Sequence, residues 1–268
     1  MDEVTPAVRT ATRPVPIGEL LQAWLALQRG DFHRPHPTSD TTGAPRRGWR
    51  PAPGEAPILV IGCASGVGAS TVALLLAAAT ASGRVVECGP AARSGLAGAS
   101  TAELGPAGDG WLQGRRDDTG IQRRTDNPTS PSDVPPPLPG QPGRVAVLDA
   151  GWEPDDLLTS DGWLGDLART CRHVVLVGRA SIPGVARLET VLARFDPERC
   201  WAVLSGAPAT LPKPVDHALG PHTRRLLEAG RLHLLPANAG LAMSGITTEP
   251  FPRPLQRTAR TLLEGLLP

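Results

Sequence analysis

The longest run without a charged side chain extends from residue 56 to residue 83 and is 28 residues long. A helix that spans a bilayer needs about 20 consecutive apolar residues, so the length alone would allow one. The middle of the run, residues 62–71, instead contains three glycines, two serines and a threonine. These residues divide the run into two short apolar blocks. We therefore predict a buried strand, a glycine-rich turn and a helix, and no transmembrane segment.

The composition excludes two kinds of site chemistry. The 268 residues include no tyrosine, so a catalytic Tyr–Lys pair cannot exist. Lys213 is the only lysine among the 27 basic residues, so a lysine that clamps a phosphate must be Lys213 or be absent. The formal net charge of +1 gives no support to nucleic-acid binding, although it does not exclude a nucleic-acid partner.

The cysteines indicate the compartment. They are widely separated, without CxxC or Cys/His ligand spacing, and we predict buried, reduced thiols in a cytoplasmic protein. No charged N-terminal stretch is followed by an apolar run and a cleavage site, so we predict no secretion signal. The four cysteines are Cys63, Cys88, Cys171 and Cys200.

The chain is interpreted as two regions. Residues 1–55 are predicted to form a flexible tail with one amphipathic helix at 17–28, which either packs on the protein's own domain or binds a partner. Residues 56–268 are predicted to form the folded domain, with an insertion at about 105–143. This insertion holds a candidate hairpin, with strands at 111–116 and 121–125. A loose proline-rich stretch follows at about 125–143, where the prolines remove most ladder donors and favour extended backbone. We expect a protein partner to bind the tail helix or the insertion.

Short apolar segments alternate with helical segments along the predicted domain. Nearly continuous apolar strands separated by helices are typical of a parallel sheet that is covered on both faces. We therefore predict an α/β fold with a mainly parallel sheet and helices on both faces, the last helix packing on the sheet. The expected strands are 57–63, 84–88, 144–148, 173–177, 200–204 and 232–235, and the expected helices are 69–81, 162–170, 185–195, 222–229 and 254–266.

The glycine-rich turn is the most informative motif. It reads Gly-Cys-Ala-Ser-Gly-Val-Gly-Ala-Ser-Thr over residues 62–71. A glycine turn between a strand and a helix directs backbone N–H groups and the positive end of the helix toward one point, where a phosphate can bind. A nucleophile elbow is excluded, because neither Ser65 nor Ser70 has a glycine two residues away on both sides.

A dinucleotide site is a second interpretation of the same turn. Gly62, Gly66 and Gly68 are similar to the glycine fingerprint of short-chain dehydrogenases, and Glu87 ends the next strand, where an acid would hold a ribose. That family uses a Tyr-x-x-x-Lys pair, which this chain lacks. Only a non-catalytic NAD(P)-binding protein of this kind remains.

A third interpretation draws on several motifs in order. Residues 65–71 resemble the deviant Walker A loop of the ParA/MinD family of P-loop ATPases, and residues 145–151 resemble its Walker B strand, with Asp149 at the strand end. Residues 173–183 and 234–236 resemble later elements of that family. The resemblance covers about residues 56–267 and implies a three-layer P-loop NTPase-like fold that binds ATP and Mg²⁺.

The chain departs from the family at two lysines. Ala69 stands at the P-loop lysine position and Ala64 at the signature lysine position, while Glu87 and Gly89 stand where the family has aspartates. Arg84 or Arg93 could supply charge from nearby. The resemblance implies nucleotide contacts from Gly66, Val67, Gly68, Ala69, Ser70, Thr71 and Glu87, Mg²⁺ ligands from Ser70 and Asp149, and a catalytic role for Asp149.

The missing lysines decide the expected activity. Catalysis in this class depends on neutralising the phosphate charge, and loss of one such group costs on the order of 10²- to 10³-fold in rate. We therefore predict weak binding of ATP, at most weak ATPase activity, and an adaptor role in DNA partition, conjugation or secretion-machinery positioning. The alternatives are an ATPase completed by an arginine in trans in a homodimer, an interaction module with an inert pocket, and the NAD(P)-binding protein described above.

Overall fold

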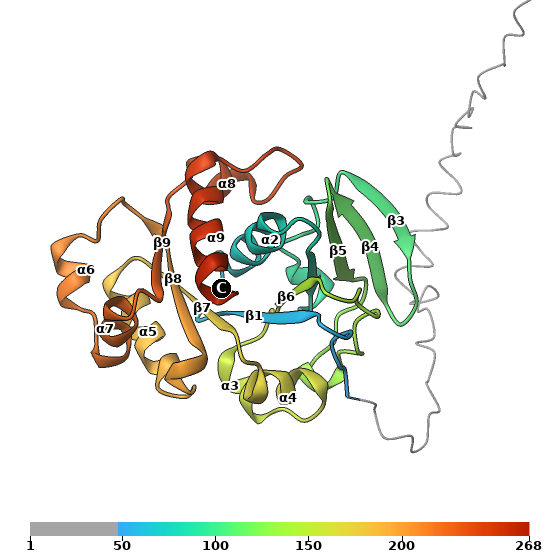
Figure 1. Ribbon diagram of the computed structural model, residues 1–268, viewed down its shortest axis with the longest axis horizontal. Helices are drawn as coiled ribbons and strands as arrows, with labels where there is room; N and C mark the ends of the chain where they lie inside the picture. The colour runs from blue at the N-terminus through green and yellow to red at the C-terminus, as the bar shows by residue number, and fades with distance from the viewer. Residues whose placement is uncertain (1–47, 268) are drawn as a thin grey trace, which may run out of the picture. The chain divides into compact units, whose positions relative to one another are not determined.

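A computed structural model describes residues 48–267, and the predicted tail helix at 17–28 lies outside the described residues. The described chain forms an α/β fold around a nine-stranded sheet, in the order β3-β4-β5-β2-β6-β1-β7-β8-β9 (Figure 1). The strands from β5 to β9 in this order are mutually parallel, and β3, β4 and β5 pair antiparallel. The predicted fold class is therefore confirmed. The strands are β1 (Ala56–Gly62), β2 (Arg84–Glu87), β3 (Ala102–Pro106), β4 (Trp111–Arg116), β5 (Thr119–Arg124), β6 (Val145–Asp149), β7 (Val174–Arg179), β8 (Cys200–Ala207) and β9 (Leu232–Pro236).

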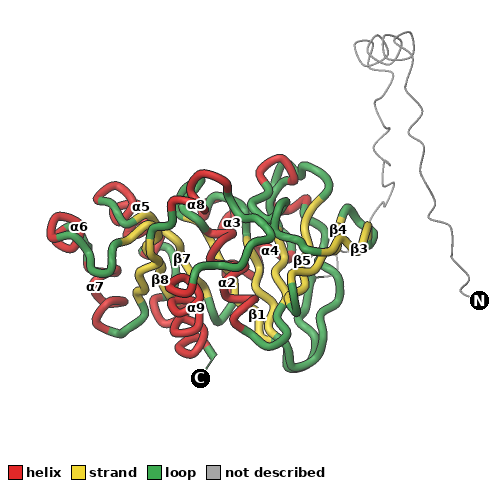
Figure 2. Tube along the Cα trace, turned by 90° about the horizontal axis from the view of Figure 1, so that it is seen from above, coloured by secondary structure: helices red, strands yellow, loops and turns green. Residues whose placement is uncertain are grey.

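Helices cover both faces of the sheet because its central strands are apolar on both sides. In β1, Ile58 and Val60 belong to one buried core, while Leu59 and Ile61 belong to the other. Helices α2 and α9 lie on the first face, and α3, α4, α5 and α7 lie on the second (Figures 1 and 2). The helices are α2 (Ala69–Ala79), α3 (Pro154–Thr159), α4 (Trp163–Thr170), α5 (Ile182–Leu192), α6 (Lys213–His217), α7 (Pro221–Glu228), α8 (Ala239–Ser244) and α9 (Arg253–Leu266).

The C-terminal helix packs as predicted. Leu255, Ala259, Leu262 and Leu266 of α9 are buried in the core that also contains α2. The sequence did not predict β3 or the short helices α3, α6 and α8. Each of these three helices has six residues or fewer, which is too short for a clear helical period.

The predicted hairpin is present in the insertion. Strands β4 and β5 pair antiparallel, and their turn consists of Asp117 and Asp118, with Asp117 at a positive φ of 51°. The second strand begins at Thr119, two residues before the predicted start. The short two-residue turn explains this, because ladder pairing can then start directly beside it.

The proline-rich stretch packs against the domain. Prolines lack an N–H donor but keep the carbonyl acceptor. Trp163 Nε1 donates to the Val134 carbonyl at 2.7 Å, and Arg84 donates to the Leu138 carbonyl at 2.6 Å. Side chains from the domain therefore hold a segment that forms no ladder of its own.

Two smaller predictions concern the cysteines and the membrane. All four cysteines are free and buried, as expected. Within residues 48–267, no helix combines the length and hydrophobicity that crossing a membrane requires. The long uncharged run forms β1, a loop and α2, as its glycines predicted.

Candidate functional site

The glycine loop joins β1 to α2 and curls at two glycines. Gly66 and Gly68 have φ angles of 70° and 89°, in the left-handed region that favours glycine. Gly68 is also the N-cap of α2, and no side chain in the described part of the protein caps this helix end. The first backbone N–H groups of α2 are therefore left for another acceptor, and they lie at the positive end of the helix dipole.

A cavity of about 320 Å³ opens at this loop. Of the site residues predicted from the sequence, the loop members and Asp149 line it together, whereas Glu87 does not. Its walls also include residues from the loops that follow β2, β6 and α8. The lining residues are Gly62, Ala64, Ser65, Gly66, Val67, Gly68, Ala69, Ser70, Thr71, Arg93, Gly95, Asp149, Gly151, Trp152, Glu153, Gly245 and Ile246.

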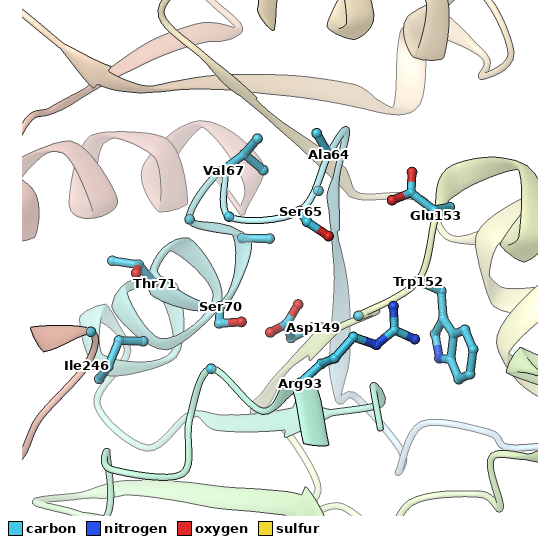
Figure 3. A pocket seen from close by; sticks show the side chains of 17 residues that line it. Ala64, Ser65, Val67, Ser70, Thr71, Arg93, Asp149, Trp152, Glu153 and Ile246 are labelled. Atoms are coloured by element: carbon cyan, nitrogen blue, oxygen red, sulfur yellow. The ribbon is translucent and has the colours of Figure 1, made fainter. Parts of the chain in front are cut away.

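Asp149 and Ser70 form the polar centre of the cavity. Asp149 is the last residue of β6, next to β1 in the sheet, and Ser70 lies in the first turn of α2. Their side chains point toward each other (Figure 3). Burial, reinforced by the negative charge of Glu87, raises the pKa of Asp149 to about 7, although the nearby Ser70 hydroxyl opposes the rise.

Glu87 has a different place from the one predicted. Its carboxylate is 3% exposed and accepts hydrogen bonds from the Ser94 hydroxyl at 2.5 Å and from the backbone N–H groups of Gly95 and Leu96 at 2.6 and 3.1 Å. The carboxylate is thus occupied by the loop after β2 and does not face the cavity. This position corrects its assignment as a nucleotide contact, and it leaves the NAD(P) interpretation without the acid that would hold a ribose.

Two glycines bring the ends of β2 and β6 together beneath the cavity. A Cβ placed on Gly151 would lie 2.5 Å from the Cα of Gly89, so Gly151 has no room for a side chain, and a Cβ on Gly89 would be tightly placed at 3.1 Å from the Cα of Gly151. Gly151 also has a positive φ of 69°. In the sequence, Gly89 was noted only because it stands where the resembled family has an aspartate. In the structure, the backbone of Gly89 packs closely against that of Gly151.

The facing wall carries Arg93, which the sequence named as one of two candidate sources of charge, and further residues that the motifs did not assign to the site. Arg93 lies in the short 3₁₀ helix Ala91–Arg93 after β2, and its guanidinium stands 5.5 Å from the centre of the Trp152 ring. Trp152 and Glu153 follow the Walker B-like strand directly, so their distance of only a few residues from Asp149 could have indicated them. Ile246 had no such signal, because it comes from a loop near the C-terminus.

The oxygen atoms and backbone N–H groups around the cavity fit a phosphate group with its Mg²⁺ ion. A serine hydroxyl beside a carboxylate supplies the hard oxygen ligands that Mg²⁺ prefers. The curled loop and the uncapped start of α2 supply N–H donors for phosphate oxygens. Ser70 and Asp149 would hold the metal and the 66–71 backbone would hold the phosphates. The loop itself contributes no cation, because Ala64 and Ala69 stand at both lysine positions.

Comparisons with known proteins gave structural similarities only. No family model matches the sequence, and no curated protein matches it either. Solved structures similar to this chain include the septum site-determining protein MinD of Pyrococcus horikoshii in complex with Mg-ADP, at 13% identity and a TM-score of 0.48, covering 80% of this chain and 96% of that one. The cell division ATPase MinD of Pyrococcus furiosus has 15% identity and a TM-score of 0.49, with 78% and 97% covered.

A putative plasmid partition protein of Borrelia burgdorferi, bound to AMPPNP, is similar at 10% identity and a TM-score of 0.45, with 80% of this chain and 98% of that chain covered. At such identities, the role of no individual residue follows from the likeness.

Proposed function

We propose that this protein binds a nucleoside triphosphate, with ATP as the candidate, together with Mg²⁺ in the cavity at the glycine loop. The observation that carries the proposal is the convergence of three features on one cavity. These are the left-handed turns at Gly66 and Gly68, the uncapped start of α2, and the facing side chains of Ser70 and Asp149. Each feature alone is common in α/β proteins, but together they supply N–H donors for phosphate and oxygen ligands for Mg²⁺.

Hydrolysis by the isolated chain is proposed to be slow at most. Neither alanine of the loop can neutralise charge that develops on a transferring phosphoryl group. Binding is affected less, because the backbone donors and the helix terminus remain. We therefore propose that the protein acts through nucleotide binding itself and not through the energy of nucleotide hydrolysis.

The cellular role is proposed from the motif resemblance. It is an adaptor that positions DNA, a conjugation system or a secretion system, with a protein partner at the N-terminal tail or at the 105–143 insertion. The proline-rich part of that insertion is held against the domain by Trp163 and Arg84, so a partner there would meet an ordered surface.

Calorimetric titration of the full chain with ATP and Mg²⁺ tests the binding proposal. We expect saturable heat that requires Mg²⁺ and is weakened by Ser70→Ala. Thr190→Ala is the matched control, because it removes an exposed hydroxyl from α5, outside the cavity. No heat at millimolar ATP in the unmodified protein would contradict the proposal and favour an inert pocket, and equal binding of NAD(P) would favour the dinucleotide alternative.

Phosphate release separates a binding protein from an ATPase completed in trans. The binding proposal predicts a slow rate of phosphate release per protein molecule, and this rate should not depend on the protein concentration. Release that rises steeply with protein concentration, and that Asp149→Ala abolishes, would instead support a dimeric ATPase.

A further inference from the structure

The loop side of the cavity carries backbone donors but no cationic side chain. Backbone N–H groups and the Ser70 hydroxyl line the loop side, while Ala64 and Ala69 leave no positive side chain there. A triphosphate carries several negative charges, which backbone dipoles alone counter only in part. Among the described residues that line the cavity, Arg93 is the cationic one, and it lies on the opposite wall (Figure 3).

The guanidinium of Arg93 is not engaged by a carboxylate. Within residues 48–267, no carboxylate lies within ion-pair distance of it. Its guanidinium instead lies over the Trp152 ring, 5.5 Å from the ring centre. A guanidinium over an aromatic face keeps its N–H donors, which lie in the plane of the group, available for oxygen acceptors.

The backbone that carries Arg93 is held at both ends. On one side, Glu87 accepts hydrogen bonds from Ser94, Gly95 and Leu96. On the other side, the backbone N–H groups of Ala91 and Ala92 donate to Asp126 and Asn127. The aromatic partner is fixed as well, because Trp152 Nε1 donates to the Cys88 carbonyl at 3.1 Å. The arginine therefore reaches the cavity from a fixed base, which lowers the entropy that a ligand must overcome in ordering it.

We propose that Arg93 is the phosphate-binding cation of this cavity and replaces, from the loop after β2, the charge that the glycine loop lacks. This inference rests on the proposed nucleotide function and specifies its charge recognition. The ligand class is a nucleotide with several adjacent phosphate charges, and affinity should increase with the number of phosphates. Glu87 then acts as a positioning residue, because it holds the loop on which Arg93 stands.

Titration of the full chain with ATP, ADP and adenosine, each with Mg²⁺, tests the assignment. Hydrogen bonds to charged groups are strong enough that Arg93→Ala should weaken ATP binding about ten- to hundredfold. The same variant should leave adenosine binding unchanged, and Arg93→Lys should recover part of the loss. Arg187→Ala, which removes an exposed arginine of α5, is the matched control and should bind ATP as the unmodified protein does.

The outcomes separate the two proposals. Tight ATP binding by the unmodified protein together with equal binding by Arg93→Ala would overturn the role of Arg93 and leave the nucleotide function standing. A loss of adenosine binding as large as the loss of ATP binding would show a structural defect and also overturn the assignment. An unmodified protein that binds none of the three compounds would overturn both proposals. Thermal melting of each variant verifies that it is folded.

Discussion

The Ser70 hydroxyl in the first turn of α2 faces the carboxylate of Asp149 at the end of β6 (Figure 3). Asp149 is buried beside the glycine loop, and the neighbouring strand residue Glu87 adds negative charge. A single hydroxyl donor does not offset these two effects, so the pKa of Asp149 stands at about 7 instead of its usual value. The carboxyl group at the centre of the cavity therefore changes its charge near neutral pH.

Asp149 should make the protein less stable as the pH rises from about 4 to about 7. Over this range the unfolded chain releases a proton that the folded chain keeps, so the free energy of unfolding falls with pH. Replacing the group with a neutral amide in Asp149→Asn should remove this loss and stabilise the protein by a few kcal/mol at about pH 8. Urea unfolding at about pH 5 and about pH 8 measures the difference.

The exposed Asp161, which lies outside the cavity, provides the control as Asp161→Asn. This variant should keep the pH dependence of the unmodified protein. An unchanged slope in Asp149→Asn would show that the destabilising charge lies elsewhere.

Binding of Mg²⁺ with a nucleotide should release a proton from Asp149. The metal requires the ionised carboxylate, and the pKa of about 7 leaves much of the group protonated near neutral pH. The affinity for Mg²⁺–ATP should consequently rise as the pH increases through about 7. Calorimetry in two buffers of different ionisation enthalpy detects the released proton, and a binding heat that is the same in both buffers would contradict this prediction.

Glu87 should contribute through its acceptor oxygens rather than through its charge. Glu87→Gln keeps an oxygen for the Gly95 and Leu96 N–H groups, and the Ser94 hydroxyl can turn to accept from the new amide. We expect this variant to unfold near the free energy of the unmodified protein. Glu87→Ala removes all three bonds and should destabilise the protein by about 2–3 kcal/mol, as measured by urea unfolding. Equal losses in both variants would instead point to the charge.

The loop and the acid of the site could be predicted because their signals are local. A strand, a glycine turn and a helix are encoded by adjacent residues, and parallel strands end at the same edge of a sheet, which places Asp149 beside Ser70. The direction of a side chain at a strand end is not encoded in this way. Glu87 therefore satisfied the motif position while its carboxylate turned to the loop of Ser94 and Gly95.

Residues placed by tertiary packing were predicted in part. The sequence named Arg93 as one of two arginines that could supply charge, whereas Ile246, which reaches the cavity from a loop near the C-terminus, had no signal in the motifs. The proline-rich stretch was predicted to be loose because its prolines lack donors. Its carbonyl groups remain acceptors, however, and the side chains of Trp163 and Arg84 donate hydrogen bonds to two of them.

Arg116 should hold the C-terminal wall of the cavity in place. From the end of β4, its guanidinium donates to the carbonyls of Thr247, at 2.6 Å, and Glu249, and it lies over the Phe251 ring at 4.6 Å. Arg116→Ala removes these contacts and should destabilise the protein by about 2–4 kcal/mol. Hydrogen exchange should also accelerate over residues 245–251.

The neighbouring Arg115 is the matched control. Its half-exposed side chain forms an ion pair with the exposed Asp118 at 3.6 Å, and Arg115→Ala should cost less than about 1 kcal/mol. Similar exchange rates over 245–251 in both variants would show that the loop is held by Ile246 and its apolar neighbours instead.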